Sequence, residues 1–178
     1  FKEKGGEAIP LPDKLCTNNI EAISLLQNAG FPKEKIAKTE ALRYFSLKDC
    51  YQIYKKPLPP TSRTLLVIMG ITDRENLFQF ELLQEAAAVG LQYYSEIWVK
   101  PHPTRSPNGL KPIYESNIDC SIKDQPLSEL WPAVDVVYGA HSSGTSWEAS
   151  WYGIPSIAVG ALNSLDLNPL TGLPGFRF

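Results

Sequence analysis

The chain has 178 residues, enough for one full domain or for one domain plus a fragment of another. Hydrophobic residues make up 43% and charged residues 20% of the sequence, which argues against disorder, and the net charge of −2 argues against nucleic acid as the main partner. No apolar run approaches the roughly 20 residues of a membrane-spanning helix. The cysteines are too scattered to indicate a disulfide scaffold or a zinc site: Cys16, Cys50 and Cys120.

The first part of the chain is polar and irregular around one predicted helix. An asparagine, Asn18 or Asn19, can cap this helix, and Gly30 ends it. The apolar stripe of the helix is supplied by Ile20, Ile23, Leu25 and Leu26. A strand-like run is expected over residues 36–45, and the proline-rich stretch 55–62 has the character of a linker.

From residue 63 onward the sequence predicts alternating strands and helices. The run 65–69 is continuously apolar, as in a strand covered on both faces, and a helix is expected over 76–90. The stripe Phe78, Leu82, Ala86 and Val89 is expected to form the apolar face of that helix. The other predicted elements are strands at 96–100, 118–122, 135–138 and 155–159, helices at 126–134 and 143–152, a loop over 104–117 and a loop or frayed end after 160.

This order of elements predicts an α/β fold with a doubly wound parallel sheet in three α/β/α layers. We assign residues 63–178 to this domain. Residues 1–62 are interpreted as the tail end of a preceding domain plus the proline-rich linker.

Ligands of open parallel sheets bind beyond the carboxyl ends of the strands, where three polar loops are expected. In the first, Gly70 allows a close turn and Thr72 can cap the next helix, so capping and ligand contact are both open. In the second, Lys100, His102 and Arg105 place positive donors at one strand end, which suits an anion such as phosphate. The alternative is a surface loop with incidental basic residues.

The third loop opens a helix and is rich in small and hydroxyl-bearing residues. They are Ser142, Ser143, Gly144 and Thr145. These residues can form an anion-binding site aided by the helix dipole, or they can simply cap the helix. Glu148, further along, can accept a bond from a ribose hydroxyl or lie exposed, and His141 is expected to form local hydrogen bonds. We expect the second and third loops to follow neighbouring strands and to hold a diphosphate or a nucleotide from two sides.

Several nucleotide and hydrolase motifs are absent from the sequence. It has no Gly-x-x-x-x-Gly-Lys-Ser/Thr loop and no Gly-x-Gly-x-x-Gly, which argues against the NTPases and dinucleotide readers that use them. It also has no His-Glu-x-x-His and no Gly-x-Ser-x-Gly. We therefore predict no metal ligands and no serine nucleophile.

The motifs that remain resemble a known family. Lys-Pro-His-Pro at 100–103 is followed by Ser-Ser-Gly-Thr-Ser-x-Glu-Ala at 142–149 and Tyr-Gly-Ile-Pro-Ser-Ile at 152–157. In this order they resemble the C-terminal half of GT-B glycosyltransferases, over residues 64–160. The nearest group carries an "HP" and an "SS" motif and includes bacterial sialyltransferases, capsule Kdo transferases and CDP-glycerol glycerophosphotransferase-like polymerases.

The resemblance implies a Rossmann-like domain that binds a nucleotide-sugar donor, with a cytidine nucleotide as in that group, and uses no further cofactor. His102 would contact the donor phosphate as the catalytic residue, and Ser142 and Ser143 would hold its other oxygens. By position in the fold, residues 70–72 would lie near the donor and residues 122–125 would flank the base. The sugar would pass to a glycan acceptor in surface polysaccharide synthesis, in the cytoplasm or at the inner face of the membrane.

GT-B enzymes have two domains, and the general base usually lies in the N-terminal one. Because residues 1–62 cannot supply that domain, we expect the chain to be part of a longer transferase that binds donor but transfers sugar poorly alone. Two alternatives stay open. One is a sugar-nucleotide epimerase of GT-B-like fold, and the other is a non-catalytic module that binds a partner protein through Trp147 and Trp151.

Overall fold

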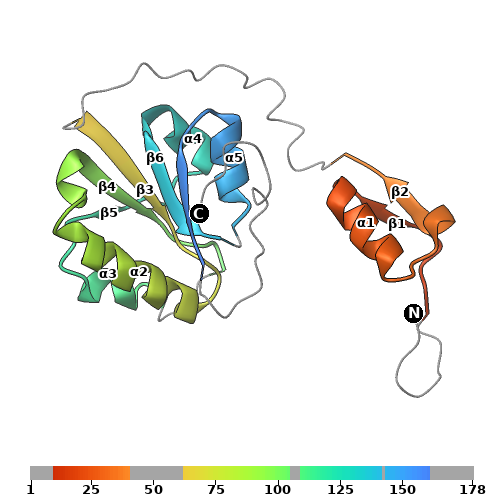
Figure 1. Cartoon of the computed structure of the whole chain (residues 1–178). Helices are drawn as coiled ribbons and strands as arrows, with labels where there is room; N and C mark the ends of the chain where they lie inside the picture. Colours follow the sequence, from red (N-terminus) through yellow and green to blue (C-terminus); the bar gives the residue numbers. More distant parts are fainter. Residues whose placement is uncertain (1–9, 41–61, 105–108, 142, 161–178) are drawn as a thin grey trace. The chain divides into compact units, whose positions relative to one another are not determined.

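The computed structural model describes residues 10–40, 62–104, 109–141 and 143–160. The chain divides into two compact units, Phe1–Lys48 and Asp49–Phe178, drawn in Figure 1. The predictions for residues 41–61 and 161–178, including most of the proline-rich stretch, lie outside the described residues, as does Cys50. The other two cysteines are free thiols.

The described part of the first unit is a small β-α-β element. Its members are β1 (Leu15–Thr17), α1 (Ile20–Asn28), the 3₁₀ turn η1 (Lys33–Lys35) and β2 (Ile36–Lys38), and the two strands pair in parallel. The predicted helix is confirmed with its cap, since the Asn19 side chain accepts from the Glu21 N–H at 2.7 Å. Gly30 follows the helix with φ +83°, which favours glycine. The three-residue β1 is too short to have shown a periodicity.

The second unit contains a five-stranded sheet whose strands are all parallel, in the order β5-β4-β3-β6-β7. The strands are β3 (Arg63–Ile68), β4 (Tyr94–Lys100), β5 (Ser121–Ile122), β6 (Val136–Ala140) and β7 (Ser156–Val159). Residues 64–68 of the central strand are all buried, as expected for an apolar run covered on both faces. The doubly wound parallel sheet is confirmed.

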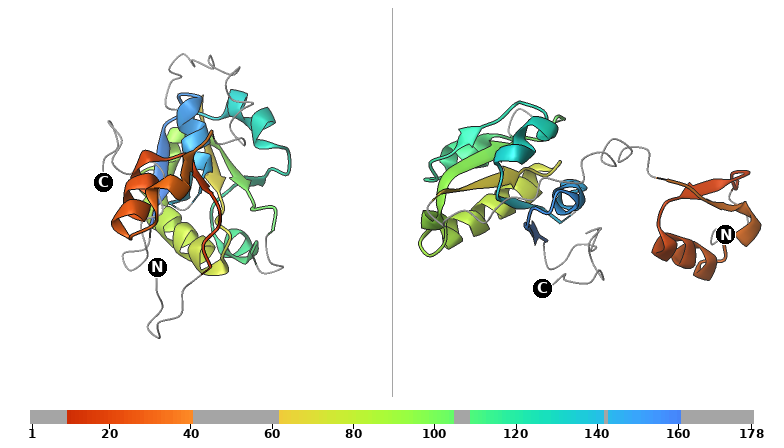
Figure 2. Two further views of the ribbon diagram at one scale, coloured as in Figure 1. Left: turned by 90° about the vertical axis from the view of Figure 1, so that its right-hand side faces the viewer. Right: turned by 90° about the horizontal axis from the view of Figure 1, so that it is seen from above.

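Helices cover both faces of this sheet, so the unit has three layers (Figure 1 and Figure 2). One face carries α2 (Asp73–Ala87) and α3 (Lys111–Glu115), and the other carries α4 (Leu127–Leu130), the 3₁₀ turn η5 (Trp131–Ala133) and α5 (Thr145–Trp151). A further 3₁₀ turn, η4 (Leu91–Tyr93), leads into β4. No helix in the described part of the chain is long and apolar enough to cross a membrane.

The prediction for the buried face of α2 was wrong. The side chains that α2 buries are Asn76, Gln79, Phe80 and Leu83. Of the expected stripe, Phe78 and Leu82 are half-buried, whereas Ala86 and Val89 are exposed. The amide of Gln79 is accommodated because its Nε2 donates to the carbonyl of Ile68 at 2.8 Å.

The expected loop over residues 104–117 was also wrong in part, because α3 lies within it. Pro112, which we interpreted as a loop residue, lies in the first turn of this five-residue helix. Proline is tolerated there because the first N–H groups of a helix have no intrahelical partner.

The two central strands β3 and β6 are joined by side chains at both ends. At the amino end, the Asp135 Oδ2 accepts from the Thr64 N–H at 2.9 Å, and the Asp135 N–H donates to the Thr64 carbonyl at 3.0 Å. At the other end, Gln79 Nε2 donates to Ile68 at 2.8 Å and reaches the Tyr138 carbonyl at 3.4 Å. The Tyr138 hydroxyl returns a bond to the Gln79 carbonyl at 2.8 Å.

Candidate functional site at the carboxyl edge of the sheet

The strand order defines where a ligand would be expected. The chain enters the sheet at β3, runs outward through β4 and β5, and returns to the other side of β3 as β6. The point where the direction reverses, between the carboxyl ends of β3 and β6, is the usual ligand crevice of a doubly wound sheet. The three predicted loops all leave the sheet at this edge.

The expectation that the second and third loops follow neighbouring strands was wrong, because β3 lies between β4 and β6. Adjacent strands are about 4.8 Å apart, so the ends of β4 and β6 are separated by about twice that distance. A ligand shared by the two loops would therefore lie over the end of β3. His102 and Ser143 still lie at the same edge of the sheet, because β4 and β6 are parallel and both loops follow the carboxyl ends of these strands.

The loop after β3 is folded around a capping box. The Thr72 Oγ1 accepts from the Glu75 N–H at 3.2 Å, and Glu75 Oε2 accepts from the Thr72 N–H at 3.2 Å and from its hydroxyl at 2.9 Å. Gly70 permits this arrangement, since a Cβ there would lie 3.0 Å from Glu75 Oε2. The structure thus places Gly70 and Thr72 in helix capping.

The capping box also has an electrostatic consequence. The positive end of the α2 dipole is where a Rossmann-type domain commonly holds a phosphate. Here the Glu75 carboxylate accepts the Thr72 N–H, and Asp73 lies in the same first turn. A phosphate at the start of α2 would meet two negative charges, so an anionic ligand is better accommodated on either side of this helix start.

The loop after β4 fixes the ring of His102. The Thr104 N–H donates to His102 Nδ1 at 3.2 Å, and the Thr104 hydroxyl lies 2.8 Å from the same nitrogen. Because a backbone N–H can only donate, Nδ1 must accept, and the ring proton of the neutral imidazole is on Nε2. No side chain or backbone group of the described residues bonds to Nε2, so this N–H can donate to a ligand.

Of the two other basic residues of this loop, Lys100 and Arg105, the structure describes only Lys100. Lys100, the last residue of β4, donates from Nζ to the Asp124 carbonyl at 2.9 Å and so ties the ends of β4 and β5 together. An ammonium group has three hydrogens, so two remain for other acceptors in this arrangement. Arg105 lies outside the described residues.

The turn between β6 and α5 satisfies part of its own backbone. Ser143 Oγ accepts from the Thr145 N–H at 3.2 Å, and the Ser146 N–H donates to the Ser143 carbonyl at 3.4 Å. Gly144 is the N-cap residue of the seven-residue α5. These bonds leave fewer donors for a ligand than the expected anion-binding site would have. Ser142 lies outside the described residues.

Glu148 holds a buried indole. Its Oε1 accepts from Trp131 Nε1 at 3.0 Å, and the Trp131 side chain is 0% exposed. Neither interpretation of the sequence, a ribose contact or an exposed glutamate, included this bond. The bond links α5, which carries Glu148, to η5, which carries Trp131, and gives an acceptor to an N–H that burial would otherwise leave unpaired.

The side chains of the remaining candidates pack locally. His141 Nδ1 lies 3.2 Å from the Val159 carbonyl, which can only accept, so Nδ1 carries a proton, as the expectation of local bonding requires. Trp147 and Trp151 are both partly buried and pack on each other with ring centroids 6.4 Å apart. Within the described ranges, no group of three or more His, Cys, Asp or Glu side chains is placed to hold a metal ion.

Glu75 is the residue of this edge that the sequence analysis missed. The signal was present, since Thr-x-x-Glu at 72–75 is the pattern of a capping box. Placing the start of the helix at residue 76 hid that pattern, because Glu75 then fell in the loop.

No protein-family model matches the chain, and the search of curated proteins gave no significant match. The protein is therefore classified by its fold. A five-stranded parallel sheet with its reversal point between β3 and β6, flanked by helices on both faces, defines a Rossmann-like α/β/α domain.

Proposed function

We propose that this domain binds the nucleotide-sugar donor of a GT-B-type glycosyltransferase. The observation that supports this best is the orientation of His102. Its Nδ1 is occupied by Thr104, and its Nε2–H is left to donate beside the crevice of a doubly wound sheet. On this proposal the donor lies across the end of β3, between the His102 loop and the turn that contains Ser143, Gly144 and Thr145, with its phosphates beside the start of α2 and not at it.

The tautomer of His102 defines its role in this proposal. A neutral imidazole that donates from Nε2 can stabilise the negative charge that develops on the leaving phosphate. Transfer of a proton from the ring would need the imidazolium, whose Nδ1–H would displace the Thr104 N–H. We therefore assign His102 as a hydrogen-bond donor to the phosphate, with Lys100 as the nearby positive charge.

The remaining parts of a transferase would come from outside this domain. The general base is proposed to lie in a preceding domain, as in two-domain GT-B enzymes, so the chain should bind donor without efficient transfer. The acceptor is proposed to be a glycan of a surface polysaccharide, modified on the cytoplasmic side of the membrane.

Calorimetric titration with CMP, CDP, UDP and their sugars tests the proposal. His102→Ala should weaken nucleotide binding by about 1.5–3 kcal/mol, the value of a hydrogen bond to a charged group, which is about 10- to 150-fold in affinity. The matched control is Gln84→Ala, an exposed change on α2 that should leave the affinity unchanged. Absence of binding to all these nucleotides at millimolar concentration, or equal affinity of the His102→Ala protein, would contradict the proposal.

A further inference from the structure

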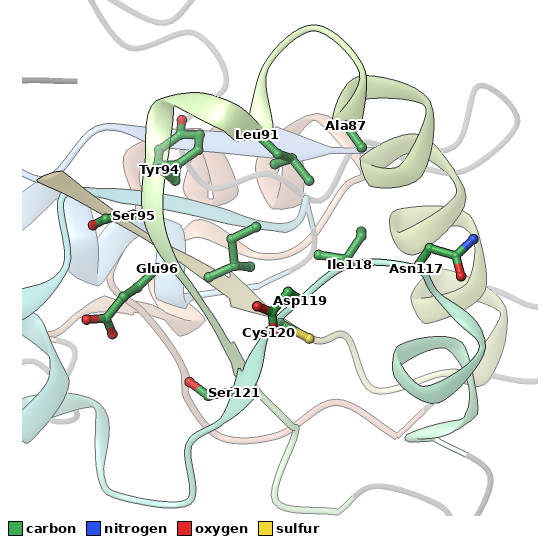
Figure 3. A pocket seen from close by; sticks show the side chains of 11 residues that line it. Ala87, Leu91, Tyr94, Ser95, Glu96, Asn117, Ile118, Asp119, Cys120 and Ser121 are labelled. Carbon is green, nitrogen blue, oxygen red and sulfur yellow. The ribbon is translucent and has the colours of Figure 1, made fainter. Parts of the chain in front are cut away.

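A groove lies at the opposite edge of the sheet from the loops just described. Its volume is about 490 Å³, and it is formed by the end of α2, the connection to β4, the first half of β4 and residues 117–121. In Figure 3 the side chains of Ser95 and Glu96 are on one side, and those of Ile118, Asp119 and Cys120 are on the other. None of these residues belongs to the proposed nucleotide site.

The first wall of the groove is a strand edge without a strand partner. β4 pairs with β3 along its length, but β5 is in register with only Trp98 and Val99. In the part of the chain that the structure describes, no strand is therefore paired with residues 94–97 on the β5 side. Unpaired edges of this kind accept extended peptides by main-chain hydrogen bonding.

The orientation of the backbone supports such pairing. The Val99 carbonyl accepts from the Lys123 N–H at 2.8 Å, so the main-chain groups of Val99 point toward β5. Because strand residues two apart point the same way, the main chain of Ile97 faces the same side; the parallel pairing of Trp98 with Ser121 uses its carbonyl, so the Ile97 N–H is the group directed to the groove. The register between β3 and β4 shifts next to Ser95, so Ser95 is the residue that has no counterpart on β3.

The groove is negatively charged. Asp119 and Glu96 line it, none of the described lysines, arginines and histidines lines it, and the last turn of α2 contains no basic residue to offset the negative end of the helix dipole. Glu96 is held in place because its Oε2 accepts from Trp98 Nε1 at 2.6 Å. Burial and the Asp119 carboxylate both raise the pKa of the Cys120 thiol, which agrees with a negative environment.

The groove also has an apolar part. Leu91, Ile97 and Ile118 line it, and the connection before β4 exposes two large hydrophobic side chains, Val89 at 73% and Tyr93 at 52%. An apolar surface beside fixed carboxylates and an open strand edge matches a segment that carries both kinds of side chain.

We propose that this groove binds an extended, basic peptide segment of a partner protein, which adds a short strand to the open edge of β4. A lysine or arginine of the segment would face Asp119 and Glu96, and the alternate apolar side chains would pack on Leu91, Ile97 and Ile118. The proposal does not depend on the nucleotide-binding function, since the two sites lie at opposite edges of the sheet.

The test uses the 178-residue chain and a fluorescein-labelled octapeptide of alternating lysine and valine, followed by fluorescence anisotropy. The Lys–Val peptide should bind, a Glu–Val peptide of the same length should not, and N-methylation of alternate amides should weaken binding at least about tenfold. Asp119→Lys should weaken binding by a similar factor. Asp124→Lys, the same charge change at the other end of β5, is the control, with thermal melting to show that each variant is folded.

A second measurement locates the peptide. Cys120 lines the groove and Cys16 is an exposed thiol of the other unit. The bound peptide should slow modification of Cys120 by N-ethylmaleimide, and modification of Cys16 should be unchanged. The proposal is overturned by any of these results: no binding at millimolar peptide, equal binding of the N-methylated peptide, no effect of Asp119→Lys, or full protection of Cys120 by lysine amide alone.

Discussion

Removing the hydrogen bond between Glu148 and Trp131 tests whether Glu148 stabilises the fold or binds a ribose hydroxyl. Glu148→Ala would leave the fully buried indole N–H of Trp131 without its acceptor. An unpaired buried donor costs about 1–3 kcal/mol, and loss of a carboxylate from the first turn of α5 adds about 0.3–1 kcal/mol. The expected loss of unfolding free energy is therefore about 1.3–4 kcal/mol.

Glu148→Gln gives the matched comparison, because its amide oxygen can still accept from the indole. Only the dipole contribution should then be lost, about 0.3–1 kcal/mol. Urea unfolding followed by tryptophan fluorescence measures both values, and a domain of this size shifts in Tm by about 2–4 °C for each kcal/mol. The Gln variant should melt clearly above the Ala variant.

A double-mutant cycle with Trp131→Phe isolates the bond from the packing of the ring. In the Trp131→Phe background the indole N–H is gone, so Glu148→Ala should cost about 1–3 kcal/mol less than in the unmodified protein. Equal costs in the two backgrounds would refute the structural role. A loss of nucleotide affinity in Glu148→Gln without any change in Tm would instead support the ribose contact.

Three further changes test other parts of the structure. Gly70→Ala should destabilise the domain by about 1–2 kcal/mol in thermal unfolding, because the new Cβ would lie 3.0 Å from Glu75 Oε2 and open the capping box; a neutral change would contradict the assignment of Gly70 to helix capping. Thr72→Ala should cost about 1 kcal/mol and leave nucleotide affinity unchanged, whereas weaker binding would make Thr72 a ligand contact. Burial raises the pKa of Tyr138 to about 12, so the neutral phenol stabilises the fold below pH 10, and about 2–3 kcal/mol is lost as the pH rises toward 12. Tyr138→Phe should reduce that alkaline loss in denaturant titrations, and an identical pH dependence would show that Tyr138 does not cause it.

The architecture of the second unit could be predicted because its strands carry strong local signals. The apolar run that became β3 is closed by Gly70, and the strands that became β6 and β7 are each bounded by polar or turn residues. Proline at the start of α3 and amides on the buried face of α2 have no such signal. Gln79 looks like a surface residue in a hydrophobic pattern, and only the strand carbonyls that it meets in the folded chain explain its burial.

The candidate site could be predicted only as a set of loops at one edge. Sequence spacing located the loops of His102 and Ser143, but it could not show that β3 separates them, since strand order is a property of the tertiary fold. Nor could it show that Glu148 is engaged by Trp131, because the two residues come from different helical segments. The groove beside β4 was missed for a related reason: an unpaired edge depends on where the neighbouring strand stops.

The side-chain links between β3 and β6 constrain how this domain can respond to a ligand. Asp135 fastens the two strands where they begin, and the amide of Gln79 spans the carbonyls of both where they end. A crevice fastened in this way cannot widen by splaying its strands without breaking buried polar bonds. Any adjustment to an incoming molecule must then come from the loops that follow the strands, while β3 and β6 keep their relative positions.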